Sequence, residues 1–413
     1  MAPSKEDETI PLLREKGKPL WSKSDIGRFL FAAVALVVLL WLCWAYILQT
    51  FAIPLIDMNA HVPFDRVRIA RYSAFSAAAY RPLGNLQSWT CKPCTWSDVK
   101  PESVVAFDDD VHETRFFTAK LARDRKKQLV ITFRGTVLES IAKWHENLDA
   151  FYAWTDMGTR TGANFGSRGG TPVQHPDVHR GFYDLYRSLE SRLFDHILGM
   201  VSTGEIHSGT EIVVAGHSLG GALATLAAYD LKVSGFNVSE VYTYGSPRVG
   251  SRDFARGYAS SLGAVTWRVV NHNDKVPHLP HFPFYHHVPA EVHCLSSDGS
   301  CDDYRIGNGS GEDPTCSFGS PVFGLPSSSI TDHGKAMGYD YYDFAGEPGL
   351  QVVEDHRPQD DVVGAGIDSL KEMMASDVWP EPGAEASDEQ RERHARWVAD
   401  FKRMKENEDY GVV

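Results

Sequence analysis

The sequence lacks an excess of basic residues. Its 41 Lys and Arg are outnumbered by 54 Asp and Glu, so the formal net charge is −13 at pH 7. This balance argues against a nucleic-acid partner and provides no electrostatic attraction to anionic lipid. The chain also lacks a visible internal repeat. Its 413 residues, 43% of them hydrophobic, suffice for one large core and a tail.

Charged residues are missing from residues 29–48, which are apolar throughout. As a helix, this stretch is long enough to cross a bilayer core about 30 Å thick. It also exceeds the ~7 to 15 residues usual for the apolar part of a cleaved signal peptide. Several basic residues precede it, and none follows before Arg66. Because basic residues stay on the cytosolic side, the stretch predicts a single-pass type II membrane protein of the secretory system.

This topology divides the chain into five segments. We expect a cytosolic tail at 1–28, a transmembrane signal anchor at 29–48, a linker at 49–64, a lumenal or extracellular globular domain at 65–345, and a polar, partly helical extension at 346–413. In the tail, Glu8 precedes Leu12 and Leu13, a pattern typical of sorting signals that adaptors bind to send cargo to a vacuole or lysosome. A disordered polar tail is the alternative.

The stretch VVAGHSLGGALATL centres on Ser218. Residues 210–215 are predicted to form a short buried strand, and the small residues after the serine a helix. The surrounding glycines permit a very tight turn that presents the hydroxyl group. The alternative is that Ser218 merely caps the helix, but a cap needs neither these glycines nor a preceding histidine. The G-x-S-x-G motif therefore predicts a nucleophile.

A serine nucleophile needs a base and a group that orients the base, in the chain order Ser, Asp or Glu, His. Asp274 follows the predicted strand 265–270, where a parallel sheet keeps its catalytic groups. His333 is the predicted base, because it lies on a loop late in the domain, after Ser218 and Asp274 in the chain. The other histidines considered as the base are His272, His278, His281, His286, His287 and His293. A metal site in that cluster is the less favoured alternative, because no known ligand spacing is present.

Charge that grows on a carbonyl oxygen requires hydrogen-bond donors. The amide of Leu219 is one donor by its position next to the nucleophile. The predicted strand 128–133 ends in the turn RGT, whose Thr136 can offer an amide and a hydroxyl. This chemistry needs no metal and no organic cofactor.

Four sequence blocks in a fixed order are more specific than the serine motif alone. They are VITFRGT, VHRGFYDLY, VVAGHSLGGALATL, and YTYGSPRVGSRDFA followed by VVNHNDKVPHLP. With them the chain resembles the class 3 lipases, α/β-hydrolases related to filamentous-fungus triacylglycerol lipases and to feruloyl esterases. The resemblance implies a mostly parallel central sheet with helices on both faces. It also implies the roles already assigned to the serine, aspartate, histidine and two oxyanion donors.

The resemblance implies hydrolysis of carboxylic esters of lipids, such as triacylglycerol, diacylglycerol or phospholipid, at a membrane or lipid surface. Two alternatives stay open: a feruloyl-type aromatic esterase with the same residues, and a catalytically silent anchored binding protein. A lid is also implied between Thr136 and Asp149, with Ile141 and Trp144 on its apolar side. An ordinary surface helix with a packed tryptophan is the alternative there.

Cysteines and glycosylation sequons complete the prediction. The resemblance favours a structural bridge between Cys91 and Cys94 over a redox pair, and a bridge from Cys294 to either Cys301 or Cys316. Relatives often carry a cysteine where this chain has Arg81, so their long bridge between the domain ends is expected to be absent. Sequons at Asn237 and Asn308 fit a lumenal domain. The glycine-rich segments 155–176 and 307–314 are expected to be flexible.

Overall fold

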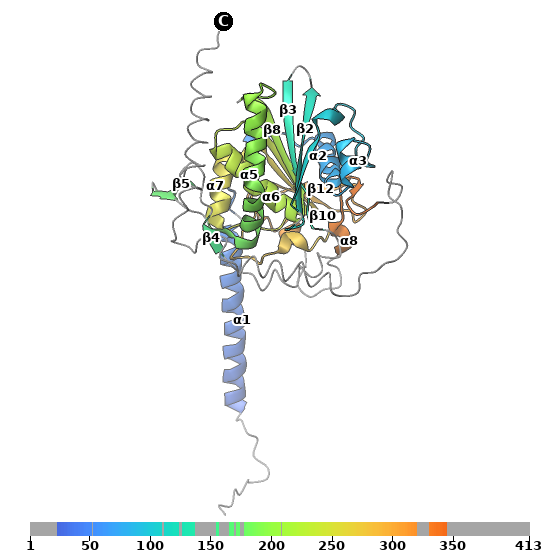
Figure 1. Ribbon diagram of the computed structural model, residues 1–413. Coiled ribbons are helices and arrows are strands. Elements are labelled where there is room, and N and C mark those ends of the chain that lie inside the picture. Colours follow the sequence, from blue (N-terminus) through green and yellow to red (C-terminus); the bar gives the residue numbers. More distant parts are fainter. Residues whose placement is uncertain are drawn as a thin grey trace, which may run out of the picture. The chain divides into compact units, whose positions relative to one another are not determined.

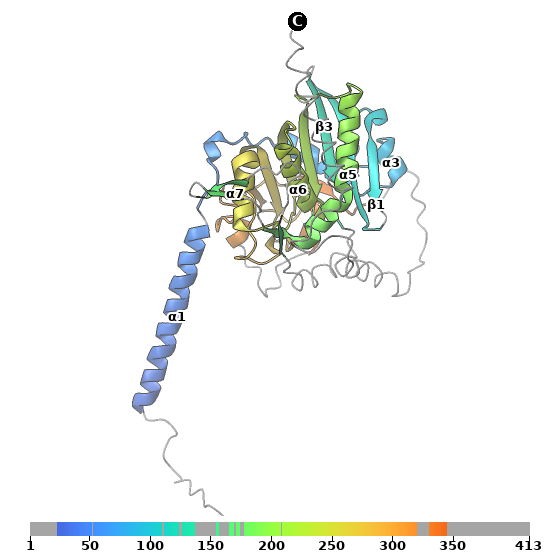
Figure 2. The same ribbon diagram turned by 60° about the vertical axis from the view of Figure 1, so that its left-hand side comes forward.

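The computed structural model describes residues 23–51, 53–109, 111–123, 126–136, 154–156, 165–168, 171–173, 177–207, 209–319 and 330–344 (Figures 1 and 2). The chain divides into two compact units, Met1–Ile53 and Pro54–Val413. The first unit holds one long helix, and the second holds a large sheet with its covering helices.

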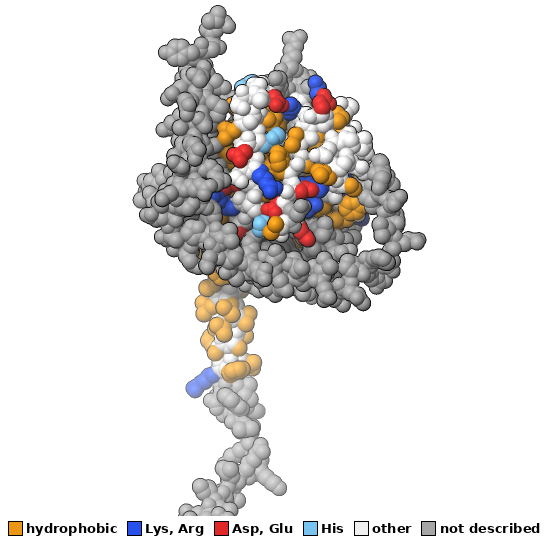
Figure 3. Space-filling model, in the orientation of Figure 1, with side chains coloured by type: hydrophobic (Ala, Val, Ile, Leu, Met, Phe, Trp, Pro, Cys, Tyr) orange, Lys and Arg blue, Asp and Glu red, His pale blue; other side chains and the backbone are white. Residues whose placement is uncertain are grey.

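The helix of the first unit, α1 (Lys23–Phe51), includes the whole apolar stretch 29–48. Apolar side chains cover the face of this helix that Figure 3 shows, and Phe31 and Trp41 are 78% and 66% exposed. The window Gly27–Trp44 has a mean hydropathy of 2.1, and none of it is buried. Its length and composition therefore suffice to cross a membrane, where a helix satisfies its own backbone hydrogen bonds.

An eight-stranded sheet forms the middle of the second unit, in the order β1-β2-β3-β8-β9-β10-β11-β12. Pairing is parallel from β3 to β11 and antiparallel at both edges, which confirms the predicted mostly parallel sheet. The strands are β1 (Val105–Asp109), β2 (Thr114–Arg123), β3 (Lys126–Phe133), β8 (Glu211–His217), β9 (Val238–Tyr244), β10 (Thr266–Asn271), β11 (Glu291–Cys294) and β12 (Tyr304–Ile306).

Helices cover both faces of this sheet, as predicted (Figure 2). They are α2 (Arg66–Ala78), α3 (Leu83–Gln87), α5 (Arg180–Ser202), α6 (Leu219–Val233), α7 (Arg252–Leu262) and α8 (Ile330–His333). Along β8, Ile212 and Val214 enter the apolar core shared with α5, α6 and α7. Val213 and Ala215 enter the core shared with α2. Because side chains alternate along a strand, an apolar run such as β8 is buried on both sides.

Short elements fill the connections. The two-stranded pairs are β4 (Trp154–Asp156) with β7 (Asp177–His179), β5 (Phe165–Arg168) with β6 (Thr171–Val173), and β13 (Lys335–Ala336) with β14 (Tyr339–Asp340). The 3₁₀ turns are Met58–Ala60, Pro101–Ser103, Gly263–Val265, Val276–His278 and Ser317–Gly319.

The second unit takes in residues 54–64 of the predicted linker. The Leu55 N–H donates to the Gly309 carbonyl at 2.9 Å. The His61 side chain is buried, with Nε2 2.9 Å from the Thr266 carbonyl and its ring centroid 4.2 Å from that of Trp267. The globular unit therefore begins before residue 65, the predicted start of the domain.

The segment 307–314 is packed, contrary to the expected flexibility. Glu312 is buried in it and accepts hydrogen bonds from Nε and Nη2 of Arg248, at 2.8 and 2.9 Å. Burial by itself raises the pKa of Glu312, but the guanidinium charge and its hydrogen bonds lower that pKa to about 2. A buried ion pair with a distant arginine thus holds the segment, which its glycine-rich composition did not indicate.

The buried Arg81 joins segments near the two ends of the described domain. Its guanidinium donates to the carbonyl oxygens of Asp343 at 2.6 Å and Asp340 at 3.1 Å, and it lies 4.6 Å from the ring centroid of Phe344. Position 81 is the one at which the resemblance noted from the sequence implies a cysteine. The buried Arg81 side chain therefore connects the early and late segments of the described domain through charged hydrogen bonds.

Replacing Arg81 with alanine is expected to lower the free energy of unfolding by about 2 to 4 kcal/mol, because the packing of a buried side chain and its charged hydrogen bonds to two carbonyls are lost. Urea denaturation of the full chain in detergent micelles, followed by tryptophan fluorescence, measures the change. Arg66→Ala is the control, since its pair with Asp302 is exposed and such pairs contribute about 0 to 1 kcal/mol. Equal losses in the two variants would contradict a connecting role for Arg81.

Candidate active site

Ser218 lies at the junction between β8 and α6, as predicted. Its backbone has φ 59° and ψ −130°, a costly combination for a residue with a side chain. Glycine nearby permits the tight turn, since a Cβ atom at Gly216 would lie 2.1 Å from the carbonyl oxygen of Gly220. The strained strand-to-helix turn has the form of a nucleophile elbow.

The Ser218 hydroxyl does not cap α6. Ser218 occupies the N-cap position, yet its side chain makes no capping hydrogen bond. Its Oγ is buried, with no hydrogen-bond partner among the residues that the structure describes. Leaving a buried hydroxyl unsatisfied costs about 1 to 3 kcal/mol. That cost and the backbone strain argue against the purely structural alternative.

His333 and Asp274 form a buried hydrogen-bonded pair. Nδ1 of His333 lies 2.9 and 3.0 Å from the two carboxylate oxygens of Asp274, and the side chains are 0% and 1% exposed. Because a carboxylate only accepts, Nδ1 carries a proton and Nε2 of the neutral ring has a lone pair. Within the described ranges this Nε2 is buried without a hydrogen-bond partner. The ring is thus prepared to accept a proton at Nε2.

The residue before Ser218 contacts His333. Nε2 of His217 donates to the His333 carbonyl at 2.8 Å, and the two ring centroids are 4.6 Å apart. The Ser218 N–H donates to the Tyr244 carbonyl at 2.9 Å. A Cβ atom on Gly245, the residue after that tyrosine, would lie 2.9 Å from Nδ1 of His333. The structure therefore brings the elbow and the acid–base pair together.

The two expected oxyanion donors lie next to the elbow. Leu219 is the first residue of α6, so its N–H has no acceptor within the helix. Thr136 follows Gly135, where a Cβ atom would lie 2.5 Å from the His217 carbonyl oxygen and 2.9 Å from the Ser218 Cβ. The loop that carries Thr136 therefore runs directly against the elbow, and glycine permits this approach.

Gly135→Ala is expected to push Thr136 away from the elbow and to lower kcat for ester hydrolysis about 10²- to 10³-fold, as the loss of one oxyanion donor does. Turnover of p-nitrophenyl butyrate by the full chain in detergent measures the effect. Gly84→Ala in α3 is the control, because nothing lies within 4 Å of a Cβ atom there. A kcat unchanged by Gly135→Ala would place the oxyanion site elsewhere.

A polar aromatic cluster behind the elbow has no counterpart among the predicted site residues. Tyr80 donates its hydroxyl proton to Nδ1 of His217 at 2.7 Å, and the His217 ring stacks on Tyr341 with centroids 3.8 Å apart. Burial, together with the nearby His333, lowers the pKa of His217 well below its usual range, so this ring stays neutral. In the sequence, only the histidine directly before Ser218 indicated such a cluster, because the tyrosines come from distant segments.

The other histidines considered as the base have different surroundings. His286 and His287 hydrogen-bond backbone carbonyls, and burial lowers the pKa of both. Burial, with the charge of Arg248, lowers the pKa of His278 to about 3. In the described part of the chain, His, Cys, Asp and Glu side chains form no group of three that could hold a metal ion.

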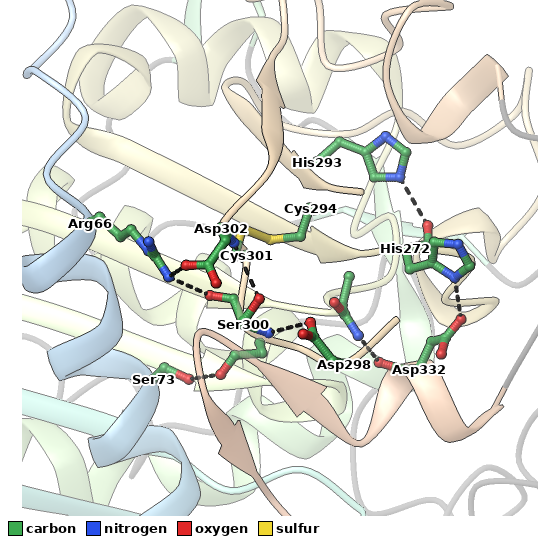
Figure 4. The surroundings of a disulfide bond; sticks show 12 residues. Arg66, Ser73, His272, His293, Cys294, Asp298, Ser300, Cys301, Asp302 and Asp332 are labelled. Atoms are coloured by element: carbon green, nitrogen blue, oxygen red, sulfur yellow. Dashed lines mark hydrogen bonds and ion pairs between the residues drawn. A yellow bond between two sulfur atoms is a disulfide. The ribbon is translucent and has the colours of Figure 1, made fainter. Parts of the chain in front are cut away.

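Both cysteine regions contain a disulfide. Cys91 pairs with Cys94, and no helix begins there as a redox pair would require. Cys294 pairs with Cys301 (Figure 4), which settles the choice left open by the sequence. Cys316 is a buried free thiol, and burial raises its pKa to about 12.

Of the remaining predicted sites, the structure describes the two glycosylation sequons but not the lid or the sorting signal. Asn237 and Asn308, the two sequon residues, are exposed. The expected lid with Ile141 and Trp144 lies outside the described residues, as do residues 1–22 with the sorting pattern and the extension 346–413.

A mostly parallel sheet with a serine elbow after β8, and with an Asp–His pair on later loops, defines an α/β-hydrolase. Residues 130–284 match the model of the family described as lipase (class 3). The chain belongs to this family.

Known proteins resemble the chain over more than this segment. Secreted mono- and diacylglycerol lipase 1 of Fusarium solani is 32% identical over 54% of this chain and 59% of its own length. The chloroplastic phospholipase A(1) DAD1 of Arabidopsis thaliana is 34% identical over 52% of this chain and 48% of its own length. The chain therefore spans roughly half of these relatives. The solved triacylglyceride lipase of Rhizomucor miehei covers 67% of this chain and 95% of its own, with 26% identity and a TM-score of 0.52.

Proposed function

We propose that the protein is a serine hydrolase that cleaves carboxylic ester bonds of lipids. The observation that carries this proposal is the pair of buried, unpartnered atoms in the described site, Oγ of Ser218 and Nε2 of His333. One can give a proton and the other can take it. The binding-protein alternative provides no reason for a strained elbow beside an oriented imidazole.

The proposed reaction proceeds through an acyl-enzyme. Nε2 of His333 takes the proton of Ser218 as Oγ attacks the ester carbonyl, while Asp274 stabilises the imidazolium. The Leu219 N–H and the donors of Thr136 stabilise the charge on the carbonyl oxygen. The imidazolium then protonates the leaving alcohol, and a water molecule, activated by the same ring, releases the acid and restores the serine.

The substrate class is inferred from the relatives. Their names specify mono- and diacylglycerols, triacylglycerides and phospholipids, all of which are glycerol esters of fatty acids. We therefore infer an acylglycerol or a phospholipid as substrate. A feruloyl ester is the second candidate, and anchoring in a membrane disfavours it because a cell-wall esterase would normally be released.

A panel of esters tests the function and the substrate together. The full chain in detergent micelles would be assayed on p-nitrophenyl esters of several chain lengths, a triacylglycerol, a phospholipid and methyl ferulate, beside Ser218→Ala. Serine-dependent turnover with a preference for a lipid ester is expected. Preference for methyl ferulate would replace the substrate class, and a folded protein with no turnover would leave the binding-protein alternative.

We also propose that α1 anchors the domain on the lumenal or extracellular side of a membrane. The basic residues ahead of the helix, two disulfides and two exposed sequons support this topology. In sealed microsomes the domain should resist added protease until detergent is present. Digestion without detergent would place the domain in the cytosol instead. Fluorescence microscopy after Leu12→Ala and Leu13→Ala would test the proposed adaptor signal.

A further inference from the structure

We propose that His272 and Asp332 are positioning residues that hold Asp274 and His333 in register, an inference that rests on the proposed function. Nδ1 of His272 donates to Oδ2 of Asp332 at 2.8 Å (Figure 4), and the Asn273 N–H approaches the same oxygen at 3.3 Å. Asp332 directly precedes His333 in the chain, and His272 shortly precedes Asp274. This cross-link, termed the His272–Asp332 clamp, joins the two loops that carry the acid–base pair.

The element that carries His333 needs such support. The helix α8 spans only Ile330–His333, and an isolated helical turn is unstable because its nucleation is unfavourable. Nδ2 of Asn271 donates to the Asp332 carbonyl at 2.9 Å, which adds a backbone contact to the clamp. Asp332 is thus held through both its carboxylate and its carbonyl by residues at the end of β10 and just beyond it.

The other half of the clamp is itself held in a strained conformation. His272 has φ 43°, which is uncommon for a residue other than glycine. Its N–H donates to the Cys294 carbonyl at 2.8 Å, and its carbonyl accepts from Nε2 of His293 at 2.9 Å. Cys294, at the end of β11, is bonded to Cys301 (Figure 4). A strained residue held from several sides commonly has a functional purpose.

The clamp connects this anchored strand end to the proposed base. The path runs from β11 through His272 to Asp332 and on to His333, with side-chain hydrogen bonds at each contact between loops. A misplacement of about 1 Å in a reacting group can lower a rate about 100-fold. Loss of the clamp should therefore lower kcat, and it should leave KM nearly unchanged because neither clamp residue is proposed to bind the substrate.

Two substitutions at position 272 separate the hydrogen bond from the backbone conformation. His272→Gly and His272→Asn both suit a positive φ, but only asparagine keeps a donor near the place of Nδ1. In the full chain in detergent, with p-nitrophenyl butyrate as substrate, we expect His272→Gly and Asp332→Ala to lower kcat tenfold to 100-fold. His272→Asn should recover kcat to within about threefold of the wild type.

A matched pair elsewhere provides the control. Nδ1 of His112 lies 2.7 Å from Oδ2 of Asp109 in the turn between β1 and β2. His112→Ala should leave kcat unchanged. Wild-type kcat in both His272→Gly and Asp332→Ala would overturn the clamp. So would a kcat loss in His272→Gly that His272→Asn does not recover and that only follows a fall in thermal stability.

A spectroscopic readout makes the result independent of turnover. A ring N–H that donates to a buried carboxylate gives a low-field proton resonance, which exchange with water removes when the bond opens. The resonance of His333, assigned by its loss in His333→Gln, should broaden or vanish in His272→Gly and persist in His272→Asn. An unchanged resonance in His272→Gly overturns the clamp. Absence of serine-dependent turnover in a wild type that shows the resonance would refute the proposed function alone.

Discussion

Ser218→Ala should abolish ester hydrolysis, lowering kcat by about 10⁵- to 10⁶-fold, because loss of a serine nucleophile removes the covalent pathway. Alanine also removes an unsatisfied buried hydroxyl, so the fold should be retained or slightly stabilised. Single-turnover kinetics on p-nitrophenyl butyrate, with thermal unfolding measured in parallel, would give both numbers.

Ser234→Ala is the matched control for this prediction. Ser234 is the C-cap residue at the other end of α6, and its Oγ is also buried without a hydrogen-bond partner in the described structure. Wild-type kcat is expected for this variant. If Ser218→Ala retained more than a few per cent of the activity, the nucleophile would have to be sought at another residue.

Asp274→Asn is expected to lower kcat about 10⁴-fold with little effect on KM. The asparagine amide can donate to Nδ1 of His333, which would move the ring proton to Nε2 and leave the ring unable to accept the proton of Ser218. Any imidazolium that did form would lack the negative charge of Asp274 that stabilises it. The pH profile of kcat/KM for both proteins would show whether the base is affected.

The conservative change at a second buried carboxylate provides the comparison. Glu312→Gln alters the buried ion pair with Arg248, which has no proposed part in the reaction, so it should affect stability more than kcat. Nearly full activity in Asp274→Asn would contradict the proposed role of the Asp274–His333 hydrogen bond. The acid would then have to be another carboxylate.

Much of the fold was predictable because its causes are local. The strand 128–133 lies within β3, the strand 265–270 largely coincides with β10, and the turn at Ser218 follows from the glycines around it. Apolar runs bounded by turn residues specify buried strands, and a glycine-flanked serine specifies the tight turn. The long apolar helix α1 is equally a property of its own residues.

The packed segment 307–314 shows where such reasoning failed. Glycines and polar residues predicted mobility, but Glu312 forms a buried ion pair with Arg248, which lies in a distant part of the sequence. Arg81 is a second case, since a position noted for a missing cysteine holds a guanidinium that donates hydrogen bonds to the carbonyls of Asp340 and Asp343. Both interactions depend on partners that are distant in the sequence, so local composition cannot predict them.

The sequence already indicated the class of reaction through Ser218, Asp274 and His333 and their order along the chain. The chemistry of a serine nucleophile restricts which residue types can serve as its acid and base. Tertiary structure alone showed how closely His333 approaches Asp274, which cysteine pairs with Cys294, and how His272 meets Asp332. Hydrogen bonds and disulfides form only within a few ångströms. Such distances between remote segments follow from the packing of the whole domain.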